Sequence, residues 1–108
     1  MRLLFVCTAN QNRSRTAEDL LRRDLRHEVR SAGTDVYDQD PEERPVTSDL
    51  VDWADLIFVM EQYHLGVLSE RFPGCERKIV VLDIPDMYAR GDPRLSNLLH
   101  ERLRPYLT

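Results

Sequence analysis

The chain has little cysteine and no long apolar run, and both shortages narrow what it can be. Only Cys7 and Cys75 occur among 108 residues, which excludes a disulfide-rich secreted scaffold, and we expect both thiols to be free in a reducing compartment. The apolar run Leu3–Val6 is too short for a signal-peptide core, and no stretch approaches the roughly 20 apolar residues of a membrane span. We therefore expect a cytoplasmic protein with no membrane partner.

An excess of positive charge is missing too. The formal net charge is −4, which disfavours a nucleic-acid partner. Residues 35–55 carry eight acids against the lone Arg44, whereas the first third of the chain is rich in arginine: Arg13, Arg15, Arg22, Arg23, Arg26 and Arg30. These arginines either steer anions toward an N-terminal loop or form a solvated helix face, and the sequence leaves both interpretations open.

No internal repeat, low-complexity tract or long linker divides the chain. Apolar residues make up 42% and charged residues 31%, as in ordinary globular proteins. We expect residues 1–108 to form one domain with one site.

Apolar patterning predicts alternating strands and helices. Apolar runs predict buried strands at 2–6, 56–60 and 79–82, and residues 29–32 predict a shorter strand before the Gly33 turn. Helical spacing appears in three sets: Ala17, Leu20, Leu21 and Leu25; Leu65, Leu68 and Phe72; and Leu95, Leu98, Leu99 and Leu103, the last preceded by Asp92 as N-cap and Pro93. The polar stretch 35–45 predicts a long loop. The fold class is α/β, a three-layer α/β/α sandwich around a four-stranded parallel sheet, with ligands at the carboxyl ends of its strands.

The segment Cys7–Ser14 links the first strand to the first helix, a position where backbone N–H groups and the helix dipole attract anions. A thiol there ionises more readily, so Cys7 is a candidate nucleophile. Arg13 can present a planar fork to phosphate oxygens. Asn10 tolerates a left-handed backbone, and the Ser14 hydroxyl can cap the helix or donate to the sulfur. The Cys-x5-Arg spacing alone fits a buried, inert cysteine equally well.

A resemblance covers nearly the whole chain. The segment Phe5–Ser14 (FVCTANQNRS), followed by Ala17-Glu18, resembles the phosphate-binding loop of the low-molecular-weight protein tyrosine phosphatases. Ser31–Thr34, Arg44–Glu61 and Ile84–Tyr88 are similar, in order, to the end of the family's second strand, the approach to its third, and its general-acid loop. Four ordered matches are far more specific than one.

The resemblance implies a phosphatase without metal or other cofactor. Cys7 would attack phosphorus, Asp86 would protonate the leaving oxygen and later activate water, and the oxygens would be held by Thr8, Ala9, Asn10, Gln11, Asn12, Arg13 and Ser14. Asp83 and Asp92 are nearby alternatives; Asp92-Pro93 imitates the family's Asp-Pro pair, but Asp92 is already needed as an N-cap. The partner of the enzyme would be a phosphorylated protein or a small phosphate monoester, and the product would be inorganic phosphate.

The walls of the cleft are expected to be aromatic: Tyr88 on one side, with Tyr37 opposite. Each tyrosine also fits an ordinary loop position. His27, His64 and His100 have no partners at ligand spacing and fit surface helix positions.

The chain departs from the family at three points. It is shortened after Thr34, where the family has a further helix and loop, so substrate preference is open. Ala9 replaces the usual glycine, and Asn12 stands where many members carry a second cysteine, so no thiol is near to protect an oxidised Cys7. The lack of further cysteines also disfavours arsenate reduction, because arsenate reductases of this fold pass a disulfide along two cysteines besides the nucleophile. Here only Cys75 is available, and we expect it in an exposed turn.

Two other functions compete with hydrolysis. One is a non-catalytic module that binds phosphorylated partners; the other is a phosphoryl carrier that holds phosphate on cysteine. Neither needs a general acid, so Asp86 favours the enzyme.

Overall fold

The computed structural model describes residues 1–36 and 42–107. Four strands form one parallel sheet in the order β2-β1-β3-β4: β1 (Arg2–Cys7), β2 (Glu28–Gly33), β3 (Leu56–Val59) and β4 (Ile79–Val81). All four predicted strands and their parallel pairing are confirmed. The central strands are continuous apolar runs because both faces of the sheet are covered.

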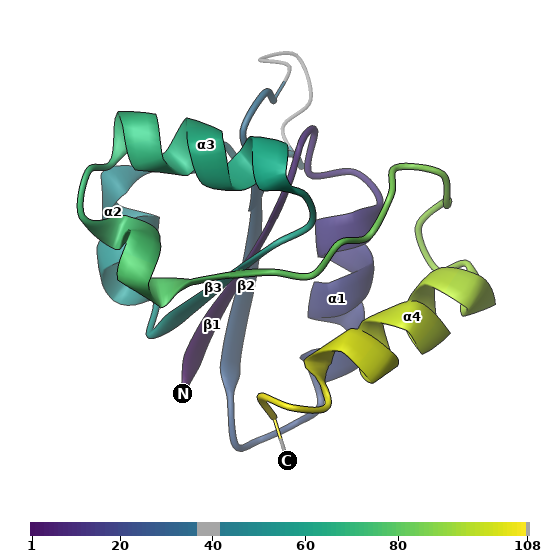
Figure 1. The fold of residues 1–108 in the computed structure, drawn as a ribbon. Coiled ribbons are helices and arrows are strands. Elements are labelled where there is room, and N and C mark those ends of the chain that lie inside the picture. Colours follow the sequence, from purple (N-terminus) through teal and green to yellow (C-terminus); the bar gives the residue numbers. More distant parts are fainter. Residues whose placement is uncertain (37–41, 108) are drawn as a thin grey trace.

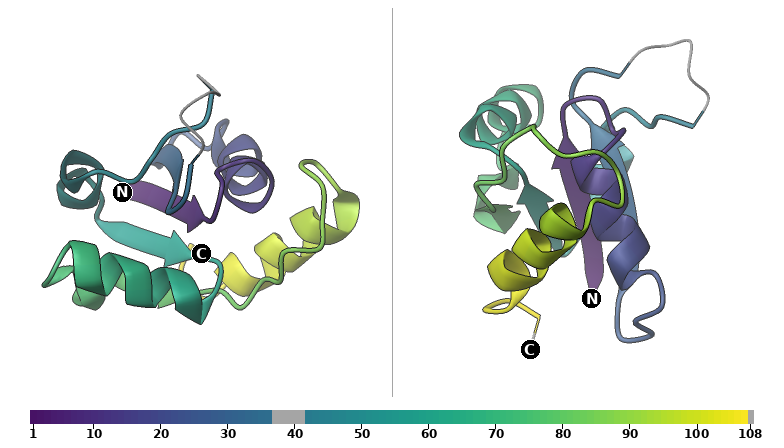
Figure 2. Two further views of the ribbon diagram at one scale, coloured as in Figure 1. Left: turned by 90° about the horizontal axis from the view of Figure 1, so that it is seen from above. Right: turned by 90° about the vertical axis from the view of Figure 1, so that its right-hand side faces the viewer.

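Helices cover the sheet on both sides (Figures 1 and 2). Helices α1 (Arg13–Leu21) and α4 (Pro93–Leu103) pack on one face, and α2 (Ser48–Trp53) and α3 (Gln62–Arg71) pack on the other. Successive residues of β1 alternate between the two cores, with Leu3, Phe5 and Cys7 on the α1–α4 side and Leu4 and Val6 on the α2–α3 side. The three-layer α/β/α prediction is confirmed.

Two local expectations need correction. The sequence analysis did not predict α2, whose start is capped by the Thr47 hydroxyl accepting from Leu50 N–H. It also placed Leu25 on the core face of α1, but that helix ends at Leu21 and the Leu25 side chain is 99% exposed. The Asp24 carboxylate accepts from the Arg26 N–H, and such a side-chain bond to the backbone competes with helix continuation.

The last helix agrees with the sequence analysis. Asp92 is its N-cap and accepts from the Arg94 N–H, and Pro93 is its first residue. Leu95, Leu99 and Leu103 are buried against the sheet. No helix in the described part of the chain is both long and apolar enough to cross a membrane.

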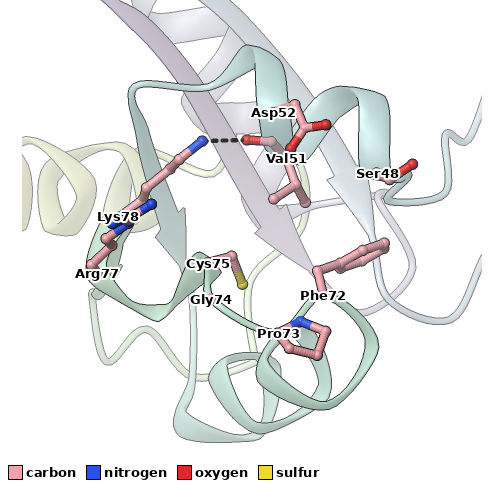
Figure 3. A pocket seen from close by; sticks show the side chains of 9 residues that line it. All are labelled: Ser48, Val51, Asp52, Phe72, Pro73, Gly74, Cys75, Arg77 and Lys78. Carbon is pink, nitrogen blue, oxygen red and sulfur yellow. Dashed lines mark hydrogen bonds between the residues drawn. The ribbon is translucent and has the colours of Figure 1, made fainter.

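A cavity of about 360 Å³ lies near the amino ends of β3 and β4 (Figure 3). It is lined by Ser48, Val51, Asp52, Phe72, Pro73, Gly74, Cys75, Arg77 and Lys78. Lys78 closes one side, because its ammonium donates to the Val51 and Ala54 carbonyl oxygens at the end of α2. The Cys75 Sγ contacts the Leu68 carbonyl at 3.6 Å. Cys75 is therefore buried in the core and starts the short 3-10 helix η1 (Cys75–Lys78), so the expectation of an exposed turn was wrong.

Candidate active site

The candidate phosphate loop, residues 8–12 and called the phosphate loop below, joins the end of β1 to the start of α1 at the carboxyl edge of the sheet. It surrounds a cavity of about 230 Å³ lined by Cys7, Thr8, Ala9, Gln11, Asn12, Arg13 and Asp86. Cys7 is 3% exposed and reaches this cavity from the last position of β1. The structure thus brings the candidate nucleophile, the candidate phosphate-binding arginine and the candidate acid to one cavity, although the sequence separates Cys7 from Asp86 by most of the chain.

The Ser14 hydroxyl lies beside the thiol. Its Oγ is 3.0 Å from Cys7 Sγ, and it accepts a hydrogen bond of 2.9 Å from Asn10 Nδ2. Because the amide already donates to Ser14, the hydroxyl proton can point at the sulfur. Ser14 can therefore serve as a hydrogen-bond donor to the Cys7 sulfur.

Asn10 fixes the middle of the phosphate loop from within the protein. Its φ of 56° lies in the left-handed region, which asparagine tolerates better than most residues. Its fully buried side chain donates to Ser31 Oγ as well as to Ser14, and its Oδ1 accepts from the Arg44 N–H at 2.9 Å. The loop is therefore held to β2 and to the segment that follows residue 41.

The end of β2 packs directly under the phosphate loop. A Cβ at Gly33 would lie 2.6 Å from the Thr8 carbonyl oxygen and 2.8 Å from the Asn10 nitrogen, so only glycine allows this approach. Beside it, the Ser31 hydroxyl donates to Glu18 Oε1, and Arg44 pairs with the same carboxylate at 3.2 Å. Glu18 is 6% exposed, so the network beneath the loop is a buried one with its charge paired.

Arg13 is buried and held in one orientation. Its Nη1 donates to Glu61 Oε1 at 2.6 Å and to the Ile84 carbonyl at 2.7 Å. Its side chain is 2% exposed, yet it lines the cavity. A guanidinium fixed along one edge is pre-organised to present the rest of its planar fork to an oxyanion.

Asp86 lies on the rim of the cavity. Its Oδ1 is 3.8 Å from Arg13 Nε, and its side chain is 64% exposed. Asp92 instead caps α4 and pairs with Arg94 at 2.8 Å, and that arginine holds the pKa of Asp92 below its usual value. Asp83 and Asp92 are both outside the lining of the cavity. The geometry therefore favours Asp86 over Asp83 and Asp92 as the proton donor.

The loop that carries Asp86 is tied to α1. The Arg90 N–H donates to Asn12 Oδ1, and the Gly91 N–H donates to Thr16 Oγ1. Arg90 also pairs with Asp19 at 2.9 Å and lowers the pKa of that carboxyl. Asp86 is thus held over the phosphate loop by contacts on the far side of its own loop.

The two candidate tyrosines are not among the residues lining this cavity. Tyr88 packs partly against the α1–α4 core, with the Arg94 guanidinium 5.4 Å from its ring centroid. Tyr37 lies outside the described residues. Aromatic walls for the cleft therefore stay a prediction.

The histidine expectation holds for one of three residues. His100 is exposed on α4. His27 is half-buried just before β2 rather than on a helix, and His64 is fully buried in α3. His64 Nε2 lies 3.0 Å from Thr8 Oγ1, and His64 Nδ1 accepts from the Glu61 N–H at 3.0 Å. Burial and the neighbouring Arg13 lower the pKa of His64 to about 4, so its ring is neutral near pH 7.

Sequence reasoning missed four supporting residues: Glu18, Ser31, Glu61 and His64. Glu61 and His64 had a readable signal, since they stand three residues apart at the start of a helix, where side chains cap the backbone. Nothing local marks Glu18 as buried, because its partners come from β2 and from Arg44. No group of three His, Cys, Asp or Glu side chains suited to a metal ion occurs among residues 1–36 and 42–107.

Comparison with known proteins agrees with this geometry. Residues 2–47 match the family model described as low molecular weight phosphotyrosine protein phosphatase. This match includes the whole phosphate loop and Ser31. No curated protein sequence matches the chain.

Solved structures are similar over nearly the whole chain. The YwlE arginine phosphatase of Geobacillus stearothermophilus is 25% identical over 98% of this chain and 92% of its own, with a TM-score of 0.76. The tyrosine phosphatase Wzb of Escherichia coli K30, solved with phosphate, is 27% identical over 97% and 94%, also with a TM-score of 0.76. Wzb of Vibrio vulnificus, solved with benzylphosphonate, shares the fold at 24% identity over 97% and 95%, with a TM-score of 0.77. The family match over residues 2–47 and these likenesses make this short chain similar to the low-molecular-weight phosphotyrosine phosphatases, and they support a cysteine-based, metal-independent phosphatase.

Proposed function

We propose that the protein hydrolyses phosphate monoesters, foremost protein phosphotyrosine, through a phosphorylated Cys7. The observation that carries this proposal is the single cavity lined by Cys7, Arg13 and Asp86, with the Ser14 hydroxyl 3.0 Å from the sulfur. A nucleophile, an oxyanion clamp and a proton donor around one space are the parts that two-step phosphoryl transfer requires.

In the first step the Cys7 thiolate attacks phosphorus, and the bond from phosphorus to the leaving oxygen breaks. Asp86 gives its proton to that oxygen, so the leaving group departs as a neutral alcohol. Arg13 and the loop N–H groups balance the charge on the equatorial oxygens, which is where charge is spread in such transition states.

In the second step the Asp86 carboxylate takes a proton from water, and the water oxygen attacks the phosphorus bound to sulfur. The sulfur–phosphorus bond breaks, which releases inorganic phosphate and restores the thiolate. Ser14 stabilises the thiolate as leaving group in this step, because its hydroxyl can donate to the sulfur that gains the charge.

Phosphotyrosine has one competitor as the substrate, and the comparisons give a reason to consider it. The Geobacillus relative is an arginine phosphatase at the same TM-score as the Escherichia relative, which is a tyrosine phosphatase. No aromatic side chain from the described residues lines the cavity, so a substrate need not be aromatic to fit it. Phosphoarginine is therefore the second candidate. We place the enzyme in the cytoplasm, where both thiols would stay reduced.

The test is hydrolysis of para-nitrophenyl phosphate with chelator present, by wild type, Cys7→Ser and Asp86→Asn. We expect turnover that Cys7→Ser abolishes and Asp86→Asn strongly reduces. Matched peptides carrying phosphotyrosine, phosphoserine or phosphoarginine then rank the substrates. Wild type that binds phosphate or vanadate without turnover would instead indicate the binding module, and a stable phosphorylated Cys7 would indicate the carrier.

A further inference from the structure

The start of α3 holds two side chains that touch the phosphate loop without lining its cavity. Glu61 is the N-cap of α3 and His64 is its third residue, and the two form a reciprocal capping box. The Glu61 N–H donates to His64 Nδ1 at 3.0 Å, and the Glu61 carboxylate accepts from the His64 N–H. In an ordinary capping box these bonds satisfy only the helix itself.

Here each member of the box makes a second contact. Glu61 Oε1 accepts from Arg13 Nη1 at 2.6 Å, and His64 Nε2 lies 3.0 Å from Thr8 Oγ1. Thr8 directly follows the nucleophile, and Arg13 directly follows the loop. One capping box therefore holds both ends of the phosphate loop.

The bonds fix which ring nitrogen carries the proton. Since the Glu61 N–H donates to Nδ1, that nitrogen is an acceptor, and the neutral ring must carry its hydrogen on Nε2. His64 Nε2 therefore donates to Thr8 Oγ1. The Thr8 hydroxyl proton is then free to point elsewhere, and Thr8 lines the cavity.

We propose that His64 is a positioning residue for phosphate chemistry: it makes the Thr8 hydroxyl a donor toward the bound phosphoryl group and, through Glu61, fixes the guanidinium of Arg13. This inference rests on the proposed function, because it assigns a role within the same site. His64 itself touches no substrate.

The surroundings of His64 support a fixed tautomer. The ring is fully buried, with the Tyr63 ring edge-on at 5.6 Å between centroids. The charged groups that act on it are Arg13, Glu61, Asp35 and Asp86, and burial with Arg13 outweighs the three carboxylates and lowers its pKa. His64 thus stays neutral, with one donor and one acceptor, throughout the neutral pH range.

The experiment is a double-mutant cycle between His64 and Thr8, read as kcat and KM for para-nitrophenyl phosphate. Thr8→Val removes the hydroxyl, His64→Leu removes both ring nitrogens, and His64→Gln returns an amide near the Nε2 position. We expect Thr8→Val to lower kcat/KM about tenfold in the wild type and less than about threefold in His64→Leu. His64→Gln should recover most of the activity lost in His64→Leu, and exposed His100→Gln serves as the control.

The proposal would be overturned if Thr8→Val lowered kcat/KM by the same factor in the wild-type and His64→Leu backgrounds. Full activity of His64→Leu would overturn it as well. A merely structural His64 would lower the thermal midpoint without changing the cost of Thr8→Val. If His64→Leu fails to fold, His64→Asn replaces it, since its oxygen can still accept from the Glu61 N–H while it cannot reach Thr8. If the wild type lacks turnover, the same cycle measured as vanadate affinity tests the inference, so its failure is distinct from failure of the proposed function.

Discussion

Each end of the sheet holds one buried free cysteine, and the two differ in their surroundings. Cys7 ends β1 beside the Ser14 hydroxyl, with Arg13 on the wall of the same cavity. Cys75 begins η1, where its Sγ donates to the Leu68 carbonyl at 3.6 Å, and burial raises its pKa. Similar exposure, 3% and 4%, therefore accompanies different surroundings: a hydroxyl and a cavity lined by Arg13 at Cys7, and an apolar core at Cys75.

The largest expected contrast is between the two thiols themselves. Cys7→Ser should bring turnover of para-nitrophenyl phosphate to background, since serine is a far poorer nucleophile at this site, whereas Cys75→Ala should stay within about twofold of wild type. Steady-state kinetics on both variants is the measurement. Comparable losses from both substitutions would place chemistry at the amino end of the sheet as well.

Asp86→Asn is expected to have the next largest effect. Removing the proton donor should lower kcat by about 100- to 10,000-fold, while Asp92→Ala should leave kcat nearly unchanged and cost about 1 kcal/mol of unfolding free energy as a lost helix cap. The pair is measured by turnover and by urea unfolding. Full activity of Asp86→Asn together with inactive Asp92→Asn would reverse the assignment of the acid.

Arg13→Lys should lower kcat/KM by about 100- to 1,000-fold, as loss of a pre-organised oxyanion donor does. A lysine cannot bond Glu61 and Ile84 along one edge and still present a planar fork to phosphate. Arg15→Lys is the matched control, because Arg15 contacts the Asn10 carbonyl through Nε but is not part of the cavity lining. Equal activity of the two lysine variants would contradict the proposal that the Arg13 guanidinium binds the phosphate oxygens.

Acid should act on stability mainly through the carboxyl end of the sheet. The folded pKa of His64 is about 4, against about 6.5 for a free histidine. Between these values the unfolded chain binds a proton that the folded chain does not, so stability falls as pH decreases from about 6.5 to about 4, by on the order of 3 kcal/mol.

Urea unfolding across this pH range measures the loss. His64→Asn should remove most of this pH dependence, whereas exposed His100→Asn should keep it. Carboxyls with lowered pKa, such as Asp24 at about 2, lose their contribution to the free energy of unfolding only at still lower pH. They therefore do not contribute to the change between pH 6.5 and pH 4. An unchanged slope in His64→Asn would show that the ring is not held neutral.

The smallest expected effect is at the amino end. Cys75→Ala removes one sulfur from the core between α2, α3 and the sheet, which should cost about 1 kcal/mol of unfolding free energy. Because its thiol is buried with a raised pKa, Cys75 should also react with a thiol reagent only after Cys7. A titration in which both thiols are modified at one rate would contradict the expected difference in reactivity between Cys7 and Cys75.

Much of this could be derived from the sequence. The strands β1, β3 and β4 are continuous apolar runs apart from Arg2, and Asp92-Pro93 marks a helix start by local capping chemistry. The phosphate loop could also be identified, because Cys7, Asn10, Arg13 and Ser14 lie within eight consecutive residues and their roles depend on a short strand–loop–helix geometry. Leu25 was misplaced because its helical spacing from Leu21 continues beyond the end of α1 at Leu21, and the Asp24 side-chain bond to the Arg26 N–H belongs to the turn that follows.

Only the tertiary structure decided the rest of the site. Glu61 and Ile84 meet Arg13, His64 meets Thr8, and Glu18 meets Ser31 and Arg44 through contacts between separate elements. The packed fold also decided the contrast between the two thiols, because it places Ser14 and Arg13 around Cys7 and an apolar core around Cys75. The sequence by itself determined the candidate nucleophile and the sheet that presents it, because those depend on neighbours along the chain. The partners that hold Arg13 and Thr8 in place depend on which strand ends meet at one edge of the sheet. Only the packed fold determines that.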